Sequence, residues 1–175
     1  MTRTNQKAKI RYMVLTGLFS ALIYVFTAFL HIPTGAGYTH AGDGLIYLSA
    51  SILPFYYAAA AGAIGASLAD GLSGFAIWIP ATLIIKVITA SFFTNKSDKI
   101  LSKRNLLAIL PSFVLCVVGY SLYEGIVMAK GFSSSAIIAA FAQTPAYCVQ
   151  IAASSALYIF TASALDRMNF KKRIM

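Results

Sequence analysis

The chain has 175 residues, of which 59% are hydrophobic and only 11% are charged. Soluble domains carry roughly 25% charged residues, so this composition excludes a water-soluble fold and indicates an integral membrane protein. The net charge of +9 does not indicate nucleic-acid binding, because the basic residues lie in short clusters between apolar runs rather than along one solvated face.

The basic residues predict which ends of the helices face the cytoplasm. Twelve of the 14 lysines and arginines fall in three segments, before residue 12, at 94–104 and after residue 166. The positive-inside bias places all three segments on the cytoplasmic side, so we expect both termini to be cytoplasmic. The chain must then cross the membrane an even number of times between consecutive segments.

The apolar runs between these segments predict six spans. The run at 12–30 is interpreted as a retained helix, because no convincing signal-peptide cleavage site follows it. Pro54 divides the next stretch in two, and the first half is short, since about 13 residues rise only ~20 Å against a hydrocarbon core of ~30 Å. We therefore expect an all-α membrane protein, a bundle of six transmembrane helices, with residues 1–175 forming a single integral membrane domain. The expected spans are 12–30, 41–53, 55–71, 76–93, 105–127 and 134–163.

Small residues are dense on two of these helices. Gly17 and Ala21 form a small-xxx-small pair on the first helix, and the stretch 58–69 carries two ridges of alanine and glycine on the third. Such ridges allow helix backbones to approach closely in lipid. They fit either packing inside this bundle or docking of another membrane subunit.

The first loop, HIPTGAGYTHAG at 31–42, is extracellular in this topology. A glycine-rich loop of this kind can fold over a site as a lid, with Tyr38 and His40 as contacts. The spacing of its two histidines matches no metal motif, and we expect neither a metal nor a cofactor.

Ionisable residues inside spans are costly and usually functional. Lys86 lies in the fourth helix among apolar neighbours, where it either snorkels to the cytoplasm or pairs with Asp70 or Glu124. Asp43 is also explained as a helix N-cap, Asp70 as a solvated helix end and Glu124 as an interfacial carboxylate. Tyr120 lies on the same helical face as Glu124.

The last helix carries a polar stripe, because Gln143, Tyr147, Gln150 and Ser154 recur at helical spacing. The stripe fits either a small polar ligand or an interhelical hydrogen-bond ladder. Together with Trp78, which alternatively anchors the helix at the membrane interface, these groups predict one occluded, outward-facing pocket beneath the first loop. The chain has no enzyme or nucleotide-binding motif, so we expect a protein that is not an enzyme.

The order of several segments resembles a known family. A basic N-terminus is followed by GLFSAL, a loop ending in AGD, AAAAGAIGASLADGLSGF and then IPATLIIKVITA. This arrangement, over about residues 12–93, resembles the S component of an energy-coupling factor (ECF) vitamin transporter of the riboflavin-transporter-like group. The second half of the chain is similar mainly in its helix count and its polar last helix.

The resemblance implies a substrate-binding subunit in the plasma membrane of a prokaryote, working with a transmembrane T subunit and two cytosolic ATPase subunits. It places Gly17 and Ala21 against the T subunit. The expected ligand is hydroxymethylpyrimidine or a pyridoxine-type vitamin, with riboflavin second. A self-sufficient proton-coupled secondary transporter, using Lys86 and an acid, is the alternative. The implied substrate-binding residues are Tyr38, His40, Trp78, Thr82, Lys86, Tyr120, Glu124, Gln143 and Tyr147.

Overall fold

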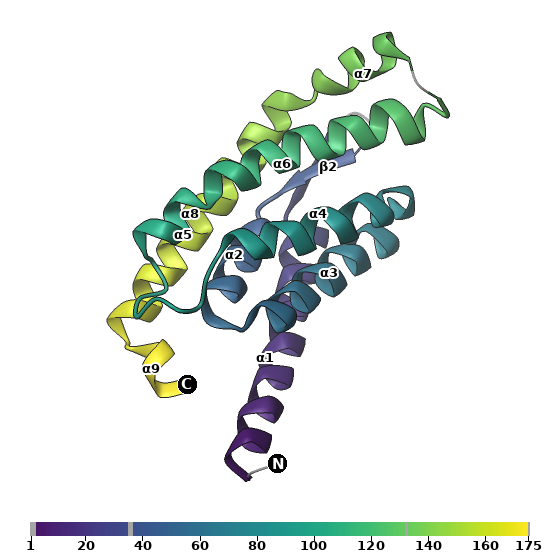
Figure 1. Ribbon diagram of the computed structural model, residues 1–175. Coiled ribbons are helices and arrows are strands. Elements are labelled where there is room, and N and C mark those ends of the chain that lie inside the picture. Colours follow the sequence, from purple (N-terminus) through teal and green to yellow (C-terminus); the bar gives the residue numbers. More distant parts are fainter. Residues whose placement is uncertain (1–2, 35–36, 132, 175) are drawn as a thin grey trace.

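The computed structural model describes residues 3–34, 37–131 and 133–174. Figure 1 shows long helices that pack along one another, with a short two-stranded hairpin lying among them. The elements in chain order are α1 (Arg3–Ala28), β1 (His31–Thr34), β2 (Gly37–His40), α2 (Asp43–Ile52), α3 (Phe55–Leu72), η1 (Ala76–Trp78), α4 (Ile79–Phe92), α5 (Lys103–Leu107), α6 (Ile109–Leu122), η2 (Tyr123–Met128), α7 (Ser134–Phe141), α8 (Thr144–Arg167) and α9 (Phe170–Ile174).

The helices have the apolar surfaces of a membrane protein, which confirms the predicted class. Three helical stretches, Gln6–Ala28, Lys103–Met128 and Ser134–Arg167, are long and apolar enough to cross a bilayer, and Ala76–Phe92 is a shorter apolar helix. Large side chains such as Val14, Leu110 and Phe160 are more than half exposed. In a bilayer these exposed apolar groups meet lipid tails rather than water.

Small residues bring α3 against α1. A Cβ atom added at Gly65 would lie 2.6 Å from the carbonyl oxygen of Ser20 and 2.8 Å from the Cβ of Ile23. The ridge on α3 therefore packs inside the molecule. Gly17 differs, because a Cβ atom there would meet none of the described residues within 4 Å, and both Gly17 and Ala21 are exposed.

The short helix α2 forms the centre of the fold, and all ten of its residues are buried. Its close contact with α8 depends on Gly44, where an added Cβ atom would lie 2.3 Å from the carbonyl oxygen of Ser154. Tyr47, on the same helix, stacks on Phe93, with ring centroids 4.7 Å apart. Because α2 is enclosed by protein, a short helix is tolerated here.

Two segments have more detailed structure than the sequence predicts. The glycine-rich first loop is a β-hairpin, in which β1 and β2 pair antiparallel with His31 opposite His40. The expected span at 134–163 falls within the apolar helical stretch Ser134–Arg167, in which a turn at Ala142 and Gln143 separates α7 from α8. Pro145 lies in the first turn of α8, where its missing N–H costs little.

Polar contacts join three separate segments at one end of the bundle. Asn105 donates to the carbonyl oxygens of Thr94 and Ile100 at 3.0 and 3.1 Å. The buried ammonium of Lys171 donates to the carbonyl oxygens of Ser51 and Ser97 at 3.0 and 2.6 Å. These bonds fix the connection between α4 and α5 against α2 and the C-terminal helix.

Candidate ligand-binding site

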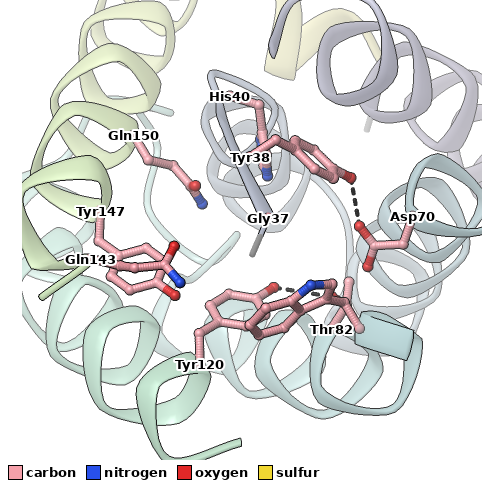
Figure 2. Close-up of a pocket in the computed structure, with 10 residues that line it drawn as sticks. Gly37, Tyr38, His40, Asp70, Thr82, Tyr120, Gln143, Tyr147 and Gln150 are labelled. Atoms are coloured by element: carbon pink, nitrogen blue, oxygen red, sulfur yellow. Dashed lines mark hydrogen bonds between the residues drawn. The ribbon is translucent and has the colours of Figure 1, made fainter. Parts of the chain in front are cut away.

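A small cavity lies beneath the hairpin, between α3, α4, α6 and α8 (Figure 2). Its volume is about 40 Å³. The side chains that face it are aromatic or polar, which is the combination expected where a small polar ring is held. The lining residues are Gly37, Tyr38, His40, Asp70, Trp78, Thr82, Tyr120, Gln143, Tyr147 and Gln150.

The hairpin directs Tyr38 and His40 towards the cavity. They are two residues apart on β2, so they project from the same face of the strand. Thr39, between them, points the other way and its hydroxyl donates to the carbonyl oxygen of Ala146 at 3.0 Å. The Tyr38 hydroxyl donates to Oδ1 of Asp70 at 2.5 Å. The hairpin is thus tied to α8 by one side chain and to α3 by another.

Aromatic rings form one wall of the cavity. Tyr120 and Tyr147 lie nearly parallel, with an interplanar angle of 17° and ring centroids 6.0 Å apart. Trp78 meets Tyr120 edge-on at 5.7 Å. The Tyr120 hydroxyl lies 3.2 Å from Oγ1 of Thr82. These rings offer flat surfaces for stacking against a planar ligand.

A buried ion pair lies beside this wall. Nζ of Lys86 is 2.6 Å from Oδ1 of Asp43, and both side chains are almost fully enclosed. The second oxygen of Asp43 accepts from Nε2 of Gln150 at 2.8 Å, and the ammonium lies 5.3 Å from the ring centroid of Tyr120. The expected partners of Lys86 were wrong: α2 and α4 pack together, so Asp43 rather than Asp70 or Glu124 neutralises the lysine.

Glu124 lies outside the cavity lining, in the π-helical turn η2 that follows α6. Its Oε2 accepts from Nε2 of Gln143 at 2.6 Å. Gln143 itself lines the cavity. Glu124 therefore affects the site indirectly, because it orients the side chain of Gln143.

His40 is neutral at pH 7. Its Nδ1 accepts a hydrogen bond from the backbone N–H of Gly42 at 3.1 Å, so the proton of the neutral ring is on Nε2. Burial of the ring lowers the pKa of His40 to about 4. The nearby Asp43 opposes this shift, and Lys86 adds to it. The ring consequently presents an N–H donor on its Nε2 side.

The structure brings together seven of the nine residues proposed from the sequence. Lys86 and Glu124 do not line the cavity, and each contacts a residue that does. Three lining residues were missed, namely Gly37, Asp70 and Gln150. The stripe that contains Tyr147 also contains Gln150, so the sequence carried a signal for it. Within residues 3–34, 37–131 and 133–174, no three His, Cys, Asp or Glu side chains gather as a metal-binding group.

The fold and the cavity define a helical membrane protein with an aromatic and polar pocket beneath its hairpin. Comparison with protein families matches residues 7–166 to the family described as ECF-type riboflavin transporter, S component, and the chain belongs to this family. Its members are substrate-binding subunits of ECF transporters rather than enzymes. Comparison with curated proteins gives no match.

Proposed function

We propose that the chain captures a small, uncharged heteroaromatic vitamin or vitamin precursor from outside the cell, as the S component of an ECF-type ABC importer. The observation that carries the proposal is the cavity under the hairpin. Aromatic rings from η1, α6 and α8 and polar groups from the hairpin and α3 converge there. Lys86, the cation nearest to this wall, is already paired with Asp43, which favours an uncharged ligand over an anionic one.

The size of the cavity favours a small ring. A buried water needs roughly 10–15 Å³ of such volume, so 40 Å³ holds about three waters. A single-ring ligand of the hydroxymethylpyrimidine or pyridoxine type enters with a modest shift of the hairpin and the aromatic wall. Riboflavin, which gives the family its name, is the second candidate, because its three fused rings require a larger opening.

We further propose six membrane spans with both termini in the cytoplasm. Contacts among the three basic segments support this arrangement. Arg11 donates to the carbonyl oxygen of Ile174, and Lys171 donates to that of Ser97. In Figure 1 both marked termini lie towards the same end of the molecule. The hairpin follows the C-terminal end of α1. A helix of 26 residues is about 39 Å long, so the hairpin and the N-terminus lie at opposite ends of α1.

The proposed partners are a transmembrane T subunit and two cytosolic ATPase subunits in a prokaryotic plasma membrane. Membership of the family supports these partners. The outward position of Gly17 and Ala21 on α1 supports the proposed contact, because both residues are exposed in the part of the chain that the structure describes. A neighbouring transmembrane helix could approach α1 closely at this point.

A proton-coupled secondary transporter is the second candidate, and the buried pair of Lys86 and Asp43 is the observation in its favour. Uptake of vitamin into liposomes by this chain alone, driven by a proton gradient, would distinguish it. The S component requires its ATPase partners, so the first proposal predicts no concentrative uptake in that assay.

Native mass spectrometry of the purified chain tests the binding proposal. We expect a bound molecule with the mass of a small vitamin. The Gly37→Leu variant tests whether the ligand occupies this cavity. Gly37 lines the cavity, and an added side chain would extend towards Trp78, 3.7 Å from the Cβ position. A folded variant should lose the bound mass. Retention of the same mass by this variant would place the ligand elsewhere.

A further inference from the structure

Asp70 presents a carboxylate oxygen without a partner to the cavity. The residue lies near the end of α3 and is 6% exposed. Oδ1 accepts from the Tyr38 hydroxyl at 2.5 Å, a length typical of a hydroxyl bound to an ionised carboxylate. Oδ2 is buried and has no geometrically defined hydrogen bond to residues 3–34, 37–131 or 133–174. The Thr82 hydroxyl lies close enough to interact with the carboxylate, and it is also 3.2 Å from the Tyr120 hydroxyl.

No cation pairs with this carboxylate among the residues that the structure describes, since Lys86 with Asp43 is their single salt bridge. A buried carboxylate oxygen that no protein group hydrogen-bonds is costly. Folding alone does not explain such a group. A ligand that donates a hydrogen bond to Oδ2 would restore the missing interaction.

The hairpin supplies a complementary donor. His40 Nδ1 is occupied by the N–H of Gly42, so Nε2 carries the proton, and Figure 2 shows the imidazole of His40 and the carboxylate of Asp70 both at the edge of the same cavity. One side of the pocket thus accepts a hydrogen bond and another donates one. Heteroaromatic rings with an amino, imide or hydroxyl group next to a ring nitrogen or carbonyl match this pair.

Resting on the proposed function, we infer that Asp70 is the specificity-determining residue of the pocket. Its Oδ2 accepts a hydrogen bond from an N–H or O–H group of a neutral or cationic vitamin. Its charge repels anionic ligands, which include phosphate esters of the same vitamins. The class of substrate is therefore the free, unphosphorylated vitamin.

Calorimetric titration of the full chain in lipid nanodiscs tests the inference. The probes are hydroxymethylpyrimidine, pyridoxine and riboflavin, each compared with its own phosphate ester. The wild type should bind at least one free vitamin at least tenfold more tightly than the ester. In Asp70→Asn, affinity for the free vitamin should fall about tenfold or more, and the preference over the ester should shrink. Asp98→Asn removes an exposed carboxylate beyond the far end of α4, and it should change neither value.

If Asp70→Asn does not fold, the Asp70→Glu variant provides the test. It keeps the charge but moves the oxygens, so it should weaken binding of the free vitamin while preserving the discrimination against the ester. An unchanged preference in Asp70→Asn, or a wild type that prefers the ester, would overturn the inference and leave vitamin binding in place. A wild type that binds none of the three free vitamins would contradict the proposed function itself, and the inference with it.

Discussion

At the scale of single residues, Tyr147 provides the sharpest test of the proposed pocket. Its ring lines the cavity beside Tyr120. We expect Tyr147→Phe to weaken vitamin binding by roughly 1–3 kcal/mol, the cost of leaving a buried polar group of the ligand unpaired. Glu124→Gln should have a smaller effect, because Glu124 acts through Gln143. Calorimetry on both variants measures the difference.

The control for this prediction is Tyr56→Phe. Tyr56 is 82% exposed on α3, so loss of its hydroxyl should leave affinity unchanged. Wild-type affinity in Tyr147→Phe would instead assign this residue to a hydrogen-bond ladder between helices.

His40 makes stability depend on pH. Its pKa is about 4 in the folded protein and about 6.5 in an unfolded chain. As the pH falls from 6.5 towards 4, the unfolded state binds a proton that the folded state does not, so the free energy of unfolding decreases. His40→Asn keeps an acceptor for the Gly42 N–H without titrating.

Thermal unfolding at pH 7.5 and pH 5 measures this effect. The melting temperature of the wild type should fall further between pH 7.5 and pH 5 than that of His40→Asn. Equal losses in the two proteins would show that His40 does not carry the dependence.

Local sequence patterns predicted part of the site. The helical spacing of the last span brought Gln143 and Tyr147 to one face, and both line the cavity. The partner of Lys86 was not predictable in this way. Whether Asp43, Asp70 or Glu124 meets the lysine depends on how α2, α3 and η2 lie relative to α4. Asp70 was missed for the same reason, because a carboxylate at a helix end looks solvated until the hairpin covers it.

At the scale of elements, substitutions at two glycines distinguish packing within the chain from assembly with the T subunit. We expect Gly65→Leu to disrupt the fold, since a Cβ atom there already lies 2.6 Å from backbone on α1. Gly17→Leu should leave the isolated subunit folded and able to bind vitamin, because its Cβ position is open. It should weaken assembly with the T subunit by holding the two helices apart, as should Ala21→Leu.

Co-purification of the complex, together with thermal unfolding of the isolated subunit, measures both effects. A full yield of complex from both α1 variants would exclude Gly17 and Ala21 from the subunit contact. Gly65→Leu with wild-type stability would contradict the close packing of α1 and α3.

The elements themselves were predicted unevenly. Long apolar runs predicted α1, α3 and α4 to within a few residues at most boundaries, α1 beginning earlier than expected. The hairpin was not predicted, because its strands have four residues each and are held by contacts from Thr39 and Tyr38 to distant helices. The last span was predicted to be continuous over 134–163, whereas a turn at Ala142 and Gln143 precedes α8, which begins at Thr144.

At the scale of the whole molecule, the six-span arrangement predicts opposite accessibility for two sites. A cysteine at Ser134, the start of α7, should react with an impermeant maleimide from outside intact cells. A cysteine at Ser97, within the basic segment at 94–104, should react only after the membrane is opened. Cys148 is exposed on α8, so the labelling uses a Cys148→Ser background. Labelling of both positions from outside would contradict the proposed topology.

Ligand binding in the hairpin-covered cavity is the central claim, and Trp78 reports on it directly. It is the single tryptophan of the chain, it lines the cavity and it is 6% exposed. Tryptophan fluorescence is followed while hydroxymethylpyrimidine, pyridoxine or riboflavin is added to the purified chain. We predict a saturable change for at least one vitamin, and its loss in the cavity-filling Gly37→Leu variant. No saturable change with any of the three, or an undiminished change in Gly37→Leu, would contradict the account.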